Sequence, residues 1–238
     1  MNRKRIWELD MLRGIAIIIV ILIHLTFDLV DLYRVWDLKN PWLYEFSRDW
    51  GGVIFLVISG ICVNLGSRTV RRGITVFLCG MLCTAVTTGM YLLNFADRSI
   101  IIYFGVLHCL GCCMLLWPLF KKAPVWLLGV LGVILVAVGL YTRDHTYVSF
   151  PWLIPLGIPS RFFISSDYFP LMPNFGYFLL GAVIGKTVYA KKESLFPNVD
   201  PNTFILRFLC GCGKHSLLIY LLHQPILAGV IAAVIALL

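Results

Sequence analysis

Seven mainly apolar stretches, most of them about 20 residues long, constrain this chain of 238 residues more than any other feature. They cover residues 11–30, 51–66, 74–93, 99–120, 124–141, 172–189 and 216–238. A helix of about 20 apolar residues crosses a hydrocarbon core that is about 30 Å thick. Apolar residues make up 60% of the chain and charged residues 13%, which is outside the range of ordinary soluble domains. The sequence therefore predicts an all-α, polytopic membrane protein with about seven transmembrane helices in a single domain, residues 1–238.

The first stretch resembles a secretory signal peptide in one respect, since basic residues precede an apolar run. No small-residue cleavage site follows that run, and His24, Asp28 and Asp31 stand where one would be needed. We therefore expect the first helix to be retained as a membrane span.

The distribution of Lys and Arg predicts the orientation, because these residues favour cytoplasmic loops. With the N-terminus in the cytoplasm, the cytoplasmic segments hold Arg3, Lys4, Arg5, Arg68, Arg71, Arg72, Lys121, Lys122, Lys191, Lys192, Arg207 and Lys214. The opposite segments hold only Arg34, Lys39, Arg48, Arg98, Arg143 and Arg161. This bias predicts a multi-pass protein with its N-terminus in the cytoplasm. The net charge of +8 then reflects topology and contact with anionic lipid, with no indication of nucleic-acid binding.

The eight cysteines lie inside apolar stretches or near the predicted cytoplasmic face. This placement argues against a disulfide framework and favours small packing residues over metal ligands. We expect no metal.

Two segments outside the seven stretches have their own character. Residues 142–171 are apolar and aromatic but contain four prolines, which predicts a re-entrant or interfacial segment over the outer side of the bundle. Residues 203–212 predict a short amphipathic helix along the inner surface. Small residues at Gly129 and Gly132, and at Gly181 and Gly185, permit close helix pairing within one chain or in a homodimer.

Ionisable side chains within a membrane are costly and usually serve a function. His24 and Asp28 are four residues apart, so they share one helix face and can form an imidazole and carboxylate pair. His24 lies about 20 Å from the cytoplasmic edge, and His108 lies about 13 Å from the outer face. These depths predict that His24 and His108 meet in one cavity, whereas His223 lies about 10 Å above the cytoplasmic face.

Each of these residues also has a purely structural interpretation. A buried histidine commonly hydrogen-bonds to a backbone carbonyl of a neighbouring helix, and this alternative stays open for His108 and His223. Asp10 and Arg13 either anchor the first helix at the interface or hold an anionic ligand through the guanidinium group of Arg13.

Several strings along the chain resemble one known family. They are residues 5–16 (RIWELDMLRGIA) followed by His24 and Asp28, 55–60 (FLVISG), 104–111 (FGVLHCLG), 167–170 (DYFP), 176–185 (GYFLLGAVIG) and 213–225 (GKHSLLIYLLHQP). In this order they resemble bacterial members of the heparan-alpha-glucosaminide N-acetyltransferase catalytic-domain family. The opening string is also similar, more distantly, to the acyltransferase-3 family.

The resemblance implies an acyl-CoA-dependent membrane acyltransferase of a bacterial-type plasma (inner) membrane. It would move an acetyl group from cytoplasmic acetyl-CoA to a sugar, glycan or lipid-linked acceptor with a hydroxyl or amine group at the outer side. One feature departs from the family: residues 31–51, after the first helix, contain no histidine to match the one proposed as active in the eukaryotic enzyme. That role is therefore not transferred, nor is the eukaryotic sugar substrate.

The residues themselves support a mechanism for acyl transfer. We expect His24 to act as the base, with Asp28 orienting it and His108 assisting or stabilising the oxyanion. The residues expected to bind CoA are Asp10, Arg13, Arg68, Arg71, Arg72, Lys214, His215 and His223. Direct transfer in a ternary complex and an acyl-histidine intermediate both stay open.

The alternative function is that of a proton-coupled secondary transporter, in which His24, Asp28, His108 and His223 would relay protons. We find no inverted repeat in the sequence to support it.

Overall fold

The computed structural model describes residues 5–33, 35–37, 42–145 and 150–237. Four residues used to predict the orientation, Arg3, Lys4, Arg34 and Lys39, lie outside these ranges. The described part is helical and contains no β-strand beyond an isolated bridge. Its α-helices are α1 (Trp7–Phe27), α2 (Trp42–Val63), α3 (Thr69–Leu92), α4 (Val106–Phe120), α5 (Val125–His145), α6 (Leu171–Thr187), α7 (Phe204–Lys214) and α8 (Ser216–Leu237). Each of the seven apolar stretches coincides with a helix, and α7 lies where the short amphipathic helix was predicted.

Five helical segments among the described residues are long and apolar enough to cross a membrane. They are Trp7–Val30, Tyr44–Val63, Thr69–Leu92, Val125–Arg143 and Ser216–Leu237. Helix α4 is apolar but has only 15 residues, and α6 has 17. The chain is therefore a multi-pass membrane protein, in which helices satisfy their own backbone hydrogen bonds away from water.

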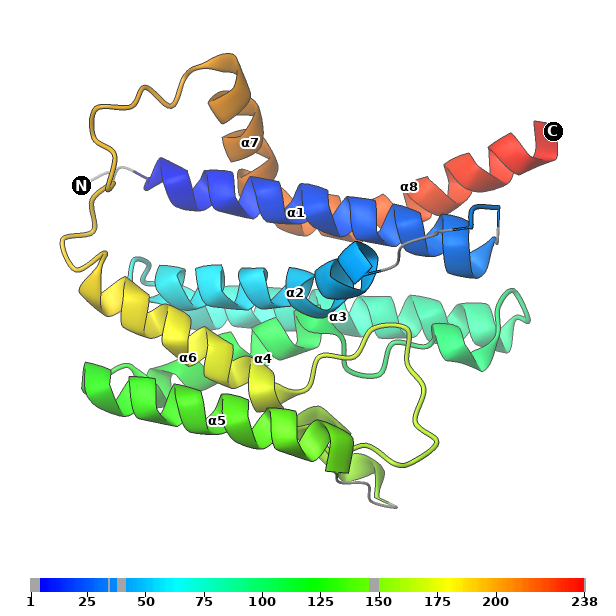
Figure 1. Ribbon diagram of the computed structural model, residues 1–238, viewed down its shortest axis with the longest axis horizontal. Helices are drawn as coiled ribbons and strands as arrows, with labels where there is room; N and C mark the ends of the chain where they lie inside the picture. Colours follow the sequence, from blue (N-terminus) through cyan, green and yellow to red (C-terminus); the bar gives the residue numbers. More distant parts are fainter. Residues whose placement is uncertain (1–4, 34, 38–41, 146–149, 238) are drawn as a thin grey trace. The chain divides into compact units, whose positions relative to one another are not determined.

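The chain folds as two compact units, and each is described by itself. Unit 1 comprises residues 1–55 and 192–238, and unit 2 comprises residues 56–191. Within unit 1, α7 stands across the first half of α1 and α8 runs along α1 (Figure 1).

Glycines allow α7 to approach α1 closely. A Cβ atom on Gly14 would overlap the carbonyl of Leu209, and a Cβ on Gly213 would overlap the carbonyl of Asp10. Since any side chain at these positions would separate the two backbones, Gly14 and Gly213 fix the level at which α7 meets α1.

A buried carboxylate also holds the segment that leads to α7. Glu8, which is only 3% exposed, accepts hydrogen bonds from the hydroxyl of Ser194 at 2.9 Å and from the backbone N–H of Leu195 at 2.8 Å. Charge-assisted bonds of this kind stabilise the fold at the predicted cytoplasmic end of α1.

Unit 2 is built from α3, α4, α5, α6 and the last turns of α2. Helix α5 packs along α6, and α3 packs along α4 (Figure 1). The core contains Trp117, Phe178 and Leu179, all nearly inaccessible to solvent. Gly181 and Gly185 lie directly against Val57 and Ile61 of α2. These two glycines therefore mediate pairing within the chain, whereas no neighbour lies near Gly129.

The segment before α6 is tied to the start of α4. The hydroxyl of Ser165 donates to the carbonyl of Ile101 at 3.0 Å, and the N–H of Phe169 donates to the carbonyl of Phe104 at 2.9 Å. Trp152 and Phe162, in contrast, are more than four-fifths exposed within the structure. Exposed aromatics fit a position at the membrane interface. The re-entrant or interfacial placement of this segment stays a prediction.

Candidate functional site

A group of polar side chains lies between α1 and α8 in unit 1. Asp28 is fully buried at the point where α1 passes into a single π-helical turn, Asp28–Leu32. Its Oδ1 atom accepts a hydrogen bond from the side-chain amide of Gln224, at 2.8 Å. This π-helical turn is the last turn of the helix, a form in which helices often end. Asp28 thus has a partner in α8, in addition to sharing a helix face with His24.

Two histidines meet beside this hydrogen bond. The rings of His24 and His223 lie edge to face with their centroids 4.8 Å apart. Nδ1 of His223 lies 2.5 Å from the carbonyl of Tyr220. A carbonyl only accepts, so Nδ1 carries the proton of the neutral ring and Nε2 keeps its lone pair. His223 is therefore arranged to accept a proton at Nε2.

Buried atoms without hydrogen-bond partners concentrate in this group. Among the described residues these include Oδ2 of Asp28, Nε2 of His223 and Oε1 of Gln224. Leaving such atoms unpaired in an apolar interior is costly, and native structures contain few of them. The three atoms are proton acceptors, so they fit a ligand or substrate that brings N–H or O–H groups. We call His24, Asp28, His223 and Gln224 the buried polar cluster.

The pairing of His24 with His223 differs from the arrangement expected from depth along single helices. Gly213 approaches Asp10 and Gly14 in the first turns of α1, and α8 begins three residues later, at Ser216. His223 follows Ser216 by seven residues, or about 10 Å of helix. The contact between α7 and α1 therefore sets the level from which α8 runs along α1 to bring His223 against His24.

His108 lies in unit 2, in the first turn of α4, and is 2% exposed. Nδ1 accepts from the backbone N–H of Gly105 at 3.2 Å, so the ring proton is on Nε2, which lies 3.3 Å from the hydroxyl of Thr84. That hydroxyl donates onward to the carbonyl of Ile102 at 2.6 Å. Phe77 and Phe104 pack against the ring at 5.6 Å. Nδ1 of His108 thus caps α4 and Nε2 contacts Thr84 of α3, and its assisting role in catalysis stays a prediction.

At the predicted cytoplasmic end of α1, Asp10 is 2% exposed and pairs with two arginines. Oδ1 lies 2.7 Å from Nη1 of Arg13, and Oδ2 lies 3.1 Å from Nε of Arg5. A small cavity of about 210 Å³ adjoins this group and is lined in part by Arg207 and Lys214. The predicted residues Asp10, Arg13 and Lys214 are therefore gathered at one basic place in unit 1.

Cys210 lines the same cavity, and His215 directly follows Lys214, another of its lining residues. The thiol of Cys210 lines the cavity and donates to the carbonyl of Trp7 at 3.4 Å, and burial raises the pKa of this thiol. A raised pKa keeps Cys210 protonated and unreactive. His215 caps the C-terminus of α7 through its backbone N–H, which donates to the carbonyl of Gly211.

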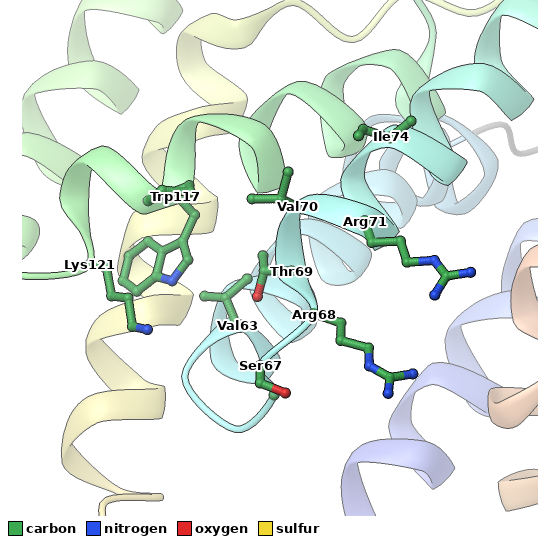
Figure 2. A pocket seen from close by; sticks show the side chains of 11 residues that line it. Val63, Ser67, Arg68, Thr69, Val70, Arg71, Ile74, Trp117 and Lys121 are labelled. Atoms are coloured by element: carbon green, nitrogen blue, oxygen red, sulfur yellow. The ribbon is translucent and has the colours of Figure 1, made fainter.

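The remaining predicted cations lie at the start of α3 in unit 2. Arg68 and Arg71 line a cavity of about 510 Å³, together with Trp117 and Lys121 (Figure 2). Arg72 does not line it, and its guanidinium group lies beside Gly66. Of the residues expected to bind CoA, Asp10 and Lys214 thus line the smaller cavity, in unit 1, and Arg68 and Arg71 line the larger one, in unit 2. The other four, Arg13, Arg72, His215 and His223, line neither.

The sequence analysis gave one residue of the buried polar cluster a different role and gave another no role. His223 was expected to contact the cofactor, and Gln224 was given no role. Their adjacency to each other in an apolar stretch was the available signal, since two polar residues in a row are unusual there. No group of three or more His, Cys, Asp or Glu that could hold a metal ion occurs among the described residues.

The apolar helices and the buried polar cluster define a multi-pass membrane protein with ionisable groups inside its helices. A family model described as heparan-alpha-glucosaminide N-acetyltransferase, catalytic, matches residues 5–225, and the chain belongs to this family. The match confirms the resemblance noted in the sequence and indicates a membrane acetyltransferase. Neither the comparison with curated proteins nor the comparison with solved structures gave a match.

Proposed function

We propose that the protein transfers an acetyl group from acetyl-CoA to a hydroxyl or amine acceptor, and that the buried polar cluster carries out the chemistry. The observation that supports this most is the pair of imidazoles, His24 and His223, beside a fully buried carboxylate. Membership in an acetyltransferase family supplies the reaction class. Proton transfer to and from a positioned imidazole is what acyl transfer from a thioester requires.

The proton and bond changes assign a role to each residue. One imidazole takes the proton from the acceptor hydroxyl or amine as the acceptor atom attacks the thioester carbonyl carbon. The carbon–sulfur bond then breaks, and the leaving thiolate receives a proton from an imidazolium. Asp28 stabilises the imidazolium by its negative charge, and Gln224 holds the Asp28 carboxylate in place. His24 and His223 share these two proton transfers.

The length of the donor molecule fits the spacing within unit 1. Asp10 and Arg13 lie fourteen and eleven residues before His24, or about 20 Å along α1. A pantetheine arm is roughly this long, so the thioester would reach His24 while the phosphates stay near basic side chains. In unit 1 the proposed cations are Arg13, Lys214 and His215. Arg68, Arg71 and Arg72 of unit 2 stay predicted CoA contacts, and the spacing within unit 1 does not bear on them.

The topology that this function needs has seven crossings with the N-terminus in the cytoplasm. Helices α4 and α6 supply the two crossings beyond the five long apolar segments, each over about 22 to 26 Å of helix. The donor then enters from the cytoplasm. The acceptor, a sugar, glycan or lipid-linked molecule, is presented at the outer side.

The test is release of CoA from acetyl-CoA by the purified protein in proteoliposomes, with amino sugars as trial acceptors. His24→Ala should lower kcat by about 100-fold or more, because a general base contributes at least that much. The matched control is His145→Ala, at the end of α5 in unit 2. Full activity of the His24→Ala protein would refute the proposed mechanism.

A secondary transporter would use the same polar groups without breaking a bond. Thermal stabilisation separates the two functions, because an acyltransferase binds CoA and is stabilised by it, whereas a proton-coupled permease is not. We expect the unfolding temperature to rise with the concentration of CoA.

A further inference from the structure

The larger cavity in unit 2 has an unusual combination of groups around it. It measures about 510 Å³ and is lined by residues from the α2–α3 connection, the first turn of α3 and the end of α4. Three of the lining side chains, Arg68, Arg71 and Lys121, are cationic and exposed. Among the described residues, no acidic one lines the cavity. An anion that enters it would meet only attractive charges.

The start of α3 adds backbone donors to these charges. The first N–H groups of a helix have no partners within the helix, and together with the helix dipole they favour anions. The N-cap position is occupied by Arg68, which provides no side-chain cap, and the first turn of α3 contains no acidic residue. The donors at the start of this 24-residue helix are therefore not satisfied by a side chain at the cap.

An independent observation comes from Trp117. Its side chain is 1% exposed, and its indole Nε1 has no hydrogen-bond partner. Figure 2 shows the indole nitrogen on the side of the ring that faces Val63 and the amino group of Lys121. A buried N–H donor is almost always paired in a native protein, so this donor lacks an acceptor that a ligand would bring.

A neighbouring contact holds the indole ring in position. Nζ of Lys186 lies 5.8 Å from the centre of the ring and donates to the carbonyls of Lys121 and Ala123, at 2.9 and 2.8 Å. These bonds cap the end of α4 from α6. The ring of Trp117 also packs edge to face on Phe178. The unpaired N–H therefore belongs to a ring that contacts from α6 hold at the end of α4.

We propose that this cavity binds a phosphate group of an organic ligand, with Arg68, Arg71 and Lys121 supplying the charge and the indole N–H of Trp117 the buried hydrogen bond. A phosphate brings several acceptor oxygens and negative charge, which match this set of donors. Two sources carry this chemistry: the nucleotide end of CoA and the headgroup of an anionic phospholipid. The first would deepen the proposed function, and the second would be independent of it.

Adjacent residues give matched variants for a binding test. Lys121→Gln removes a charge that lines the cavity, whereas Lys122→Gln removes the same charge from the next residue, which does not line it. Trp117→Phe keeps an aromatic ring and removes the N–H donor together with part of the buried volume of the indole. The probes are adenosine 3′,5′-bisphosphate, added to protein in phosphatidylcholine nanodiscs, and phosphatidylglycerol incorporated in the nanodiscs without nucleotide. Thermal unfolding reports binding in both arms.

Lys121→Gln and Trp117→Phe should each weaken the binding of one of the two probes by about tenfold. Lys122→Gln should leave the binding of both probes unchanged. Loss of nucleotide binding identifies CoA as the source, and loss of the phosphatidylglycerol effect identifies the lipid. If neither probe stabilises the protein, or if Lys121→Gln and Lys122→Gln act equally, the site does not exist. Because neither probe carries a thioester, such a failure would leave the acetyl-transfer proposal standing. Since Lys121 is exposed, its variant tests the site even if Trp117→Phe fails to fold.

Discussion

The histidine at the start of α4 and the two histidines between α1 and α8 are all placed within helices, but their surroundings differ. Both ring nitrogens of His108 have partners within unit 2, the N–H of Gly105 and the hydroxyl of Thr84. In unit 1, Nε2 of His223 and Oδ2 of Asp28 are buried without partners. A satisfied polar group stabilises the fold that surrounds it, whereas an unsatisfied one costs stability and persists where a function needs it. The comparison favours a structural role for His108 and supports the chemistry proposed for the buried polar cluster.

The largest expected effect is on catalysis. His223→Ala should lower kcat for acetyl transfer by about 100-fold to 10,000-fold, because the variant loses a proton acceptor at the reacting atoms. The thermal unfolding temperature should change little, since the ring makes one hydrogen bond to the backbone carbonyl of Tyr220. Steady-state kinetics and thermal unfolding of the same preparation check both statements. A His223→Ala protein with normal kcat would remove the functional half of the comparison.

The next effect is on stability. His108→Ala should lower the free energy of unfolding by about 2 to 4 kcal/mol, because it removes two buried hydrogen bonds and leaves a cavity between Phe77 and Phe104. Thr84→Val should cost about 1 kcal/mol as the partner control. Denaturant unfolding in detergent measures both.

The same His108 variant also tests the catalytic prediction made from the sequence. If kcat per folded molecule fell by hundreds of times while stability was unchanged, His108 would act in catalysis and the contrast with the buried polar cluster would be wrong.

The smallest effect concerns the positioning of Asp28. Gln224→Leu removes the amide that donates to Oδ1 at 2.8 Å, so we expect kcat to fall by about tenfold with KM for acetyl-CoA unchanged. Gln224→Asn, which keeps the amide on a shorter side chain, should recover part of the loss. A change in KM for acetyl-CoA alone would mean that Gln224 contacts acetyl-CoA and does not position the Asp28 carboxylate.

Hydropathy predicted the helices well, and the exceptions have physical causes. The second helix begins at Trp42, nine residues before the predicted start, because Glu45 and Arg48 lower the hydropathy of its first turns. The fourth begins at Val106, seven residues after the predicted start at residue 99. Part of the intervening stretch is held by hydrogen bonds to Ser165 and Phe169, more than sixty residues away. Local composition cannot report such contacts.

The candidate site was only partly predictable for a similar reason. The shared face of His24 and Asp28 follows from their four-residue spacing. The contact between Asp28 and Gln224 joins positions 196 residues apart and depends on where α8 starts relative to α1. Two glycines set that level through the overlap that larger side chains would cause. A sequence shows the glycines but not which backbones they bring together.

The close approach of Gly213 to α1 places the start of the last helix, because α8 begins three residues later, at Ser216. Seven residues of α8 then lead from Ser216 to His223. Inserting one residue between Ser216 and His223 would turn the His223 ring by about 100° around the axis of α8 and move it along that axis by about 1.5 Å. The two imidazoles would then point in different directions although every side chain was retained. The number of residues in this interval is thus as much a part of the site as their identity.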